Sequence, residues 1–381
     1  MKILVLSFYY TPDLSAGSFR TSALIDELSK MDIDIDVVTT LPNRYASLKS
    51  NAAQSEKNDN LSVYRLELPS HKSGMLDQIV SFFSFYRQVS QLVKKEKYDL
   101  VYATSSRLFT AFLGTRVARS KSIPIYLDVR DIFLDTLSDV LNPKLFRMIS
   151  PFLSLIENYT FNNASHINLV SRGFEEYFKS KFRCKSYSFL TNGIDSEFMG
   201  IDFSKVEVLN KKTVLYAGNI GEGQGLHTIL PSLARNSPDY QFKVIGDGSR
   251  KVELVKSCQS LSNVVILPPI IRSQLNKEYK NADVLFLHLN DYDAFKKVLP
   301  SKLFEYGATG KPILAGVSGY AAKFCNEELL NTEVFSPSNH IEASNCLRRL
   351  SLNVTDRTMF IKKFQRNQIM RKLSESVYRM V

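Results

Sequence analysis

The stretch TVLYAGNIGEGQG, residues 213–225, opens with a short apolar run and continues into a glycine-rich loop. The run Thr213–Ala217 is typical of a parallel strand buried on both faces. Glycines let a backbone approach a phosphate group closely, but they also occur in plain tight turns. The strict spacing of a dinucleotide fingerprint is absent. The stretch therefore predicts a strand–loop–helix unit whose loop contacts phosphate or sugar, or is simply a turn.

Similar apolar runs, separated by helical patterns, occur on both sides of this stretch. Such alternation is typical of doubly wound parallel sheets. We therefore predict an α/β fold with two Rossmann-like domains, each built on a doubly wound parallel sheet, facing each other across a cleft. The expected strands are Ile3–Phe8, Asp34–Thr40, Asp99–Ala103, Ile123–Asp128, Ile167–Val170 and Tyr187–Leu190, then Thr213–Ala217, Phe242–Ile245, Val264–Leu267, Val284–Leu289, Pro312–Ala315 and Glu333–Phe335.

The chain has 381 residues, which suits two domains better than one core. We place an N-terminal domain at 1–197, an aperiodic linker at 198–212, a C-terminal domain at 213–354 and a final segment at 355–381. That segment reads as one helix, Thr355–Arg379, able to pack back toward the N-terminal domain. Near the start, Ser18 is expected to cap a helix that runs to Lys30.

The composition is that of an ordinary soluble globular protein, with 44% hydrophobic residues and no apolar run long enough to span a membrane. The net charge of +11 suits phosphate-bearing ligands, anionic lipid or nucleic acid, and does not choose among them. The charge is diffuse, tryptophan is absent and no compact recognition motif is present, so we predict no nucleic-acid partner. Four widely spaced cysteines predict reduced thiols.

The segment LPSKLFEYGATGKP, residues 299–312, is the richest in candidate ligands. Pro300 and Ser301 suit a helix start, and a helix N-terminus beyond a strand can bind an anion. Lys302 in the first turn opposes the helix dipole, which a bound anion would explain. Glu305 lies one turn later on the same face. The alternative is a Lys–Glu surface pair without function.

Two polar loops of the first half also follow predicted strands. Gly17 and Ser18 follow the first strand, with Arg20 close behind and able to reach the cleft. Arg130 and Asp131 end a later strand, beyond which such sheets bind ligands. The alternative for Arg130 is a structural ion pair with Asp128 or Asp131.

Several short motifs match one family in order: NGID (192–195), YAGN (216–219), GDG (246–248), PSKLFEY (300–306) and GKPI (310–313). Together they resemble the retaining GT-B glycosyltransferases of the large family four, and most of all the branch that builds bacterial O-antigen and capsule. The resemblance spans nearly the whole chain.

The resemblance implies that Glu305 is the second glutamate of a Glu-x7-Glu signature and binds the ribose hydroxyls of the donor. It places Lys302 near the diphosphate. We therefore predict Lys302, Asp131 and Arg130 as catalytic, no metal and no cofactor other than the nucleoside-diphosphate sugar itself, a co-substrate. The predicted donor-binding residues are Glu305, Ser301, Gly218, Asn219, Gly221, Gly223, Gln224, Gly17, Ser18, Lys297 and Gly246.

Three departures from the family pattern concern the donor sugar. Lys297 stands where relatives carry the first glutamate, and Gly223-Gln224-Gly225 stands where Lys-Gly is usual. No histidine is present in the Asp128–Asp131 loop. Lys302, with Lys296 or Lys297, would then neutralise the diphosphate. Asp291-Tyr292-Asp293 resembles the metal motif of the other glycosyltransferase fold, but the rest of the chain favours GT-B.

The predicted activity is transfer of an amino- or deoxy-sugar, with UDP as the first choice of nucleotide, to a glycan or a polyprenyl-diphosphate-linked acceptor. The predicted location is the cytoplasm, at the inner face of a bacterial plasma membrane. Tyr177–Lys185 and the Phe-rich Met75–Val93 are candidate contacts for anionic lipid, or else packed helices with a basic face. A sugar-nucleotide 2-epimerase and a non-catalytic GT-B scaffold are the alternative functions.

Overall fold

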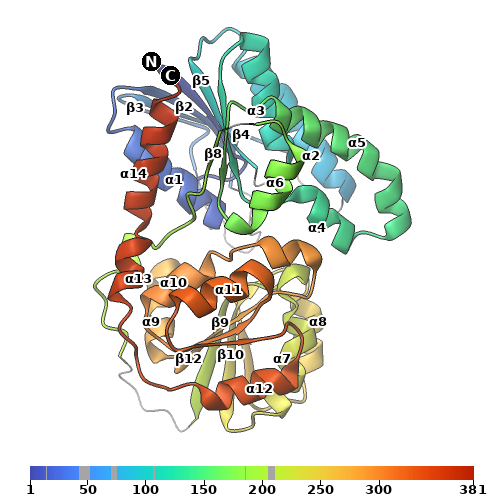
Figure 1. The fold of residues 1–381 in the computed structure, drawn as a ribbon, viewed down its shortest axis with the longest axis vertical. Coiled ribbons are helices and arrows are strands. Elements are labelled where there is room, and N and C mark those ends of the chain that lie inside the picture. The colour runs from blue at the N-terminus through green and yellow to red at the C-terminus, as the bar shows by residue number, and fades with distance from the viewer. Residues whose placement is uncertain (14, 43–51, 70–74, 106–107, 185, 205–210) are drawn as a thin grey trace. The chain divides into compact units, whose positions relative to one another are not determined.

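The computed structural model describes residues 1–13, 15–42, 52–69, 75–105, 108–184, 186–204 and 211–381 (Figure 1). The chain forms two compact units. Unit 1 comprises Met1–Asn192 with Arg366–Val381, and unit 2 comprises Gly193–Gln365. The chain thus passes from one unit to the other after Asn192, five residues before the predicted boundary at 197, and returns after Gln365. The part of the predicted linker at 205–210 lies outside the described residues.

Unit 1 is built on an eight-stranded sheet in the order β3-β4-β2-β1-β5-β6-β7-β8. All neighbouring strands are parallel except β3 and β4. The sequence prediction missed β3 and β4, since all four residues of β3 are exposed and carry no apolar pattern. The strands are β1 Lys2–Leu6, β2 Asp34–Thr40, β3 Ser55–Asn58, β4 Leu61–Leu66, β5 Leu100–Thr104, β6 Ile125–Val129, β7 His166–Leu169 and β8 Tyr187–Ser188.

The helices of unit 1 are α1 Ala16–Leu28, α2 Met75–Leu92, α3 Leu108–Lys121, α4 Phe133–Val140, α5 Pro143–Asn162, α6 Glu175–Lys181 and α14 Arg366–Tyr378, with a 3-10 turn at Arg172–Phe174. The prediction that Ser18 caps α1 was wrong. Ser15 is the cap, because its hydroxyl accepts a hydrogen bond from the Ser18 N–H at 3.1 Å. In Figure 1, α14 runs alongside α1, against which it packs.

Unit 2 holds a six-stranded, all-parallel sheet in the order β11-β10-β9-β12-β13-β14. Its strands are β9 Lys212–Asn219, β10 Tyr240–Asp247, β11 Val264–Leu267, β12 Val284–His288, β13 Ile313–Gly316 and β14 Thr332–Phe335. Its helices are α7 Leu226–Arg235, α8 Lys251–Cys258, α9 Arg272–Asn281, α10 Lys302–Ala308, α11 Gly319–Glu328, α12 His340–Arg349 and α13 Thr358–Lys363. Both predicted α/β sheets are therefore confirmed.

The predicted helix Thr355–Arg379 is two helices, α13 and α14. The chain between them is extended enough for Gln365 to form a parallel bridge with Ile194. The Ile194 N–H also donates to the Phe364 carbonyl at 2.7 Å. These backbone contacts break the helical hydrogen-bond ladder where the chain leaves unit 2.

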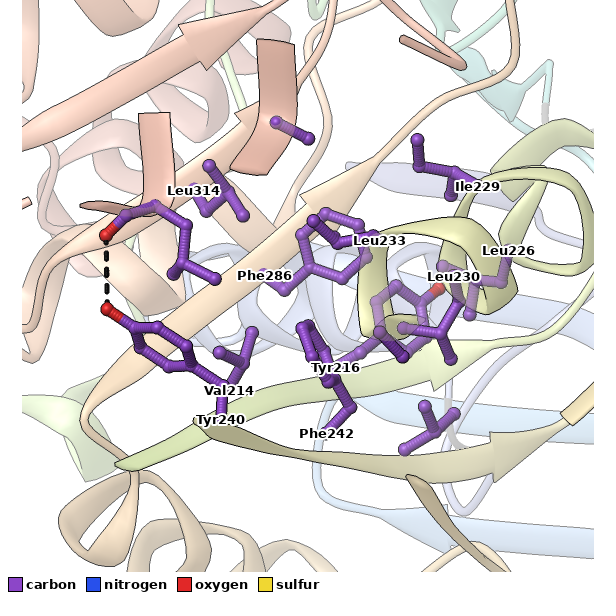
Figure 2. Close-up of a cluster of buried hydrophobic side chains, with 14 of the residues drawn as sticks. Val214, Tyr216, Leu226, Ile229, Leu230, Leu233, Tyr240, Phe242, Phe286 and Leu314 are labelled. Carbon is purple, nitrogen blue, oxygen red and sulfur yellow. Dashed lines mark hydrogen bonds between the residues drawn. The ribbon is translucent and has the colours of Figure 1, made fainter. Parts of the chain in front are cut away.

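The core of unit 2 lies where α7 packs on the sheet (Figure 2). Leu226, Ile229, Leu230 and Leu233 are spaced at i, i+3, i+4 and i+7, so they form one apolar stripe. Figure 2 shows this stripe facing sheet residues that include Tyr216, Phe242 and Phe286. The stripe fixes the start of α7, and with it the glycine-rich loop that ends at Gly225.

The order of the strands reverses between β9 and β12. The chain forms β10 and β11 on one side of β9, then crosses to form β12 on the other. Such a reversal is the switch point at which open α/β sheets bind ligands, beyond the carboxyl ends of the strands. The two strands pair only at Val214–Val284 and Leu215–Leu285, so they separate toward their carboxyl ends.

Candidate functional site

Helix α10 is anchored in the gap between β9 and β12. The Tyr306 hydroxyl accepts from the Ala217 N–H at 3.4 Å and donates to the Phe286 carbonyl at 3.3 Å. The side chain thus bridges the two strands just past the point where their own pairing ends. This contact places the first turn of α10, with Lys302 and Glu305, at the switch point.

Lys302 and Glu305 form an ion pair with a third partner, Tyr279 of α9. Lys302 Nζ donates hydrogen bonds to Glu305 Oε2 at 2.7 Å and to the Tyr279 hydroxyl at 3.0 Å. Tyr279 donates to the same Oε2 at 3.0 Å. Burial, together with Glu305, raises the pKa of Tyr279, which therefore stays protonated as a donor. The Lys–Glu pair exists, but inside this network rather than on the open surface.

The second carboxylate oxygen of Glu305, Oε1, is not used in the same way. Its nearest cation is Arg272 Nη2 at 4.0 Å, which is beyond hydrogen-bonding distance. Within the described part of the chain, no hydrogen bond to Oε1 is formed. Glu305 is only 8% exposed as a residue, but Oε1 itself is not shielded from solvent, so it can accept a hydrogen bond from a ligand hydroxyl.

Arg272, the first residue of α9, is held by the motif NGID with Phe198. Its guanidinium pairs with Asp195 and Glu197, and lies 5.2 Å from the Phe198 ring centroid. Sequence reasoning missed both Arg272 and Tyr279. Asp195 and Phe198 belong to a motif that the sequence revealed, but Arg272 lies more than 70 residues further along the chain, so the motif did not point to it.

The loop after β9 is closed by its own side chains. Gln224 Oε1 accepts from Asn219 Nδ2 at 2.7 Å and from the Gly221 N–H at 3.3 Å. A Cβ on Gly221 would lie 2.5 Å from Asn219 Nδ2, and one on Gly223 would lie 2.8 Å from the Phe295 ring. Packing inside the loop therefore explains both glycines, and the predicted phosphate contact stays a prediction.

Gly218 and Gly246 are neighbours across β9 and β10. A Cβ on Gly246 would lie 1.9 Å from the Gly218 carbonyl oxygen, so close strand packing requires glycine at this position. Ser301 occupies the N-cap position of α10 without a side-chain capping bond. Lys297 ends a 3-10 turn, Asp293–Lys297, between β12 and α10.

Asp291-Tyr292-Asp293 has ordinary local contacts. Asp291 is exposed, and Asp293 pairs with Lys296 at 2.6 Å. Over the residues described, no group of three or more His, Cys, Asp or Glu side chains is arranged to hold a metal ion.

His288 is a residue near the glycine loop that sequence reasoning missed. Its Nε2 accepts from the Ser338 N–H at 2.9 Å, so Nδ1 carries the proton and donates to the Gln224 carbonyl at 2.7 Å. Burial lowers the pKa of this ring to about 4 and keeps it neutral. A lone histidine at the end of an apolar run gave no sign that it would hold the loop.

In unit 1, Arg20 and Asp128 form a fully buried bidentate pair. The Arg20 Nε–Asp128 Oδ2 and Nη2–Oδ1 distances are 2.8 and 2.9 Å, and Asn168 donates to Oδ1 at 2.8 Å. Burial alone would raise the pKa of Asp128, but Arg20, Arg130 and Asn168 hold it at about 2. The expectation that Arg20 reaches a cleft was wrong, because α1 directs this side chain into the interior, where the buried carboxylate requires a cation.

Arg130 lies beside this pair and against Gly17. Its Nε is 3.4 Å from Asp128 Oδ2 and its Nη2 donates to Thr21 Oγ1 at 3.1 Å. Its Nη1 has no hydrogen-bond partner among the described residues and would lie 2.5 Å from a Cβ on Gly17. The structure thus brings Arg130 and Gly17 together, and the pairing of Arg130 with Asp128 is weaker than that of Arg20. The neighbouring Ser18 is buried in α1.

Asp131 differs from Asp128 because no strong partner compensates its burial. Its Oδ1 is shielded from solvent and lacks a hydrogen-bond partner in the described chain. Burial raises the pKa of Asp131 to about 7, against the lowering effect of Arg130. The carboxyl group therefore changes its charge near neutral pH.

We expect the free energy of unfolding of Asp131→Asn to rise relative to that of wild type as the pH increases from 4 to about 7. In that range the folded protein keeps a proton that the unfolded chain, with an ordinary pKa of 3.8, has lost, so wild type loses stability. The amide does not titrate, and the difference should reach about 1 to 3 kcal/mol above pH 7. Urea unfolding of both proteins at pH 4.5 and 8 measures it. An equal difference at both pH values would contradict the raised pKa.

Two family models match the chain in succession. Residues 17–185 match the glycosyl transferase 4-like domain, and residues 200–366 match glycosyl transferases group 1. The chain is a group 1 glycosyltransferase with the GT-B fold. The sequence prediction of this fold and of the broader family is confirmed.

Individual relatives are distant. WcaI of Escherichia coli (strain K12), a glycosyl transferase assigned to colanic acid biosynthesis, is 24% identical over 335 residues, 81% of this chain and 82% of that protein. A sucrose-phosphate synthase structure from Thermosynechococcus elongatus has a TM-score of 0.78 at 15% identity and covers 100% of this glycosyltransferase and 98% of its own chain. Anabaena Alr3699/HepE in complex with UDP and glucose has a TM-score of 0.70 at 18% identity, covering 99% of each chain.

Among the described residues, no helix of this glycosyltransferase is both long and apolar enough to cross a bilayer.

Proposed function

We propose that this glycosyltransferase uses a UDP-sugar donor, bound at the switch point of unit 2, and retains the anomeric configuration. The observation that carries the proposal is Glu305, whose Oε1 lacks a donor while Oε2 is held by Lys302 and Tyr279. A carboxylate fixed in this way accepts ribose hydroxyls without reorganising. One protein with the same fold, Anabaena Alr3699/HepE, has structures in complex with UDP, with UDP and glucose, and with UDP-glucose, which favours the uridine nucleotide.

The chemical problem is the negative charge that grows on the diphosphate as the glycosidic bond breaks. A fixed cation aimed at the leaving oxygen lowers this barrier, because its interaction is stronger in the transition state than in the ground state. Lys302, one turn before Glu305, is our candidate. We propose that no metal or further cofactor takes part. The catalytic roles of Arg130 and Asp131 in unit 1 rest on the family resemblance and stay predictions.

For the biological role, we propose assembly of a bacterial surface polysaccharide. The supporting observations are the similarity to a colanic acid glycosyl transferase and to the lipopolysaccharide galactosyltransferase WaaB, whose structure has a TM-score of 0.65 at 14% identity. The acceptor would be a glycan or a polyprenyl-diphosphate-linked sugar, met at the cytoplasmic face of the membrane. An amino- or deoxy-sugar as the transferred group rests on the branch that the sequence resembles.

Calorimetry with a panel of nucleoside diphosphates tests the donor site. We expect selective binding of UDP, and a loss of affinity of about 10-fold or more in Glu305→Gln, since one hydrogen bond to a charged acceptor contributes about 1.5 to 3 kcal/mol. Glu278→Gln is the matched control, because Glu278 lies on α9 and pairs only with Lys243 at 2.5 Å. Failure of every nucleotide to bind wild type would favour a non-catalytic scaffold.

The product separates transfer from epimerisation. With a donor that binds, release of UDP in the presence of an acceptor extract supports transfer. A rearranged nucleotide sugar without release of UDP would instead identify a sugar-nucleotide 2-epimerase.

A further inference from the structure

Helix α5 has two apolar faces, and only one of them is buried. Leu153, Ile156 and Phe161 pack into unit 1. On the opposite side, Met148, Phe152 and Leu155 are 72, 64 and 68% exposed. Their spacing of four and three residues places them in one stripe on the helix surface. A surface helix normally presents polar residues here, so this stripe, which we name the α5 stripe, needs an apolar environment.

The charges that α5 itself exposes beside the stripe have one sign, whereas the neighbouring helix α4 carries Asp135 and Asp139. Lys144 and Arg147 lie at the start of the same helix and are exposed. The next acidic residue along the helix, Glu157, is buried and pairs with Lys181. The stripe is therefore flanked by cations without a compensating carboxylate on its own exposed face.

Helix α2 also exposes apolar side chains. Ile79, Val80 and Phe83 are 55, 56 and 68% exposed there. Helix α3 lies between the two helices, since the hydroxyls of Tyr86 on α2 and Tyr159 on α5 both act on Arg116 of α3 and raise its pKa. Arg116 is itself exposed. The guanidinium of Arg116 therefore lies between α2 and α5, the two helices that expose apolar side chains.

The basic–aromatic segment Tyr177–Lys185 does not supply such a surface. Phe178 and Phe182 are buried against Phe161, with ring centroids at 4.9 and 5.0 Å, and Lys181 is engaged by Glu157. Lys185 lies outside the described residues. Both phenylalanines of this candidate segment for lipid contact are therefore core residues.

We propose that the α5 stripe, with the exposed face of α2, is the surface by which the protein docks on an anionic lipid bilayer. Apolar side chains enter the headgroup region while flanking Lys and Arg meet anionic headgroups. A second copy packed through α5 fits less well, because α5 exposes Lys144 and Arg147 but no carboxylate that could pair with them. The inference rests on the proposed action on a lipid-linked acceptor, and it assigns the membrane surface that this action requires.

Vesicle flotation tests the proposal. Wild type should float with vesicles of phosphatidylglycerol and phosphatidylcholine, and far less with phosphatidylcholine alone. Met148→Ser/Phe152→Ser/Leu155→Ser should reduce the bound fraction about tenfold or more, as should Lys144→Glu/Arg147→Glu, with the second loss resembling that caused by high salt. The matched control is Val252→Ser/Val255→Ser on α8, which removes exposed valines (82 and 47%) from unit 2 and should bind as wild type does.

Three results would overturn the inference: no flotation of wild type, equal flotation of the α5 variants, or a lipid-free dimer that the triple variant converts to a monomer. The last would assign the stripe to a second copy. Calorimetric UDP binding is measured on the same proteins without lipid. If wild type does not bind UDP, the proposed donor site is refuted. If it binds UDP normally but does not float with vesicles, only the membrane surface is refuted.

Discussion

Lys302→Ala is expected to lower the rate of sugar transfer about 100-fold or more, the usual cost of removing one donor from a developing oxyanion. Lys302 Nζ donates to Glu305 Oε2 at 2.7 Å and to the Tyr279 hydroxyl at 3.0 Å. These two hydrogen bonds hold the amine of an otherwise flexible side chain in one position. A preorganised cation acts on the leaving diphosphate without paying for reorganisation during the reaction. The measurement is release of nucleoside diphosphate from the donor selected in the binding panel, at saturating donor.

The same substitution removes the partner of a half-buried carboxylate, so a structural effect must be separated from a catalytic one. Thermal unfolding of the variant measures the structural part, and kcat at saturating donor measures the catalytic part. Lys323→Ala is the control, since Lys323 pairs with Glu327 over 3.8 Å on the surface of α11. A near-normal kcat in Lys302→Ala, with or without a lower melting temperature, would remove Lys302 from the catalytic site.

Most strands of the two sheets, though not β3 and β4, were predictable because a buried parallel strand is a continuous apolar run. β1, β9 and β12 are examples, and their predicted bounds differ from the observed ones by at most a few residues. β3 escaped because it is an exposed strand paired along one edge only. The break between α13 and α14 escaped for another reason. It is set by a backbone contact of Gln365 with Ile194, which no local pattern encodes.

The candidate site was predictable only as far as local spacing reaches. Lys302 and Glu305 are one helical turn apart, and that spacing was enough to expect the pair. Tyr279 and Arg272 come from the preceding helix, so their part in the cluster depends on how α9 and α10 pack. The glycine loop shows how a motif can have two explanations: its glycines suggested a ligand, which stays a prediction, and the nearby Phe295 ring is a second reason for Gly223.

The same limit applies to the buried charges of unit 1. The sequence suggested an ion pair of Arg130 with Asp128 or Asp131, and the pair with Asp128 is formed, at 3.4 Å. The bidentate partner of Asp128 is Arg20, which is 108 residues away in the chain and was not suggested. Proximity in sequence is a weak guide to buried ion pairs, because parallel strands and their helices bring together residues from separate βα units.

Asp128→Ala is expected to destabilise unit 1 by about 3 to 5 kcal/mol, since removing one partner leaves the other charge buried and uncompensated. Here the cost falls on Arg20, whose side chain is fully buried, and to a lesser extent on Arg130. Asn168 also loses the acceptor for its Nδ2, which lies 2.8 Å from Oδ1. The effect should therefore spread from β6 to α1 and β7.

Hydrogen exchange followed by mass spectrometry resolves this effect, because a two-domain protein need not unfold in one step. Peptides from α1, β6 and β7 should exchange faster by about 100-fold or more in Asp128→Ala, while those from the core of unit 2 serve as an internal reference. Glu375→Ala is the matched control, since it removes an exposed pair with Arg371 on α14 of the same unit and should change exchange little. Equal protection of α1 in wild type and Asp128→Ala would show that the buried pair does not stabilise this unit.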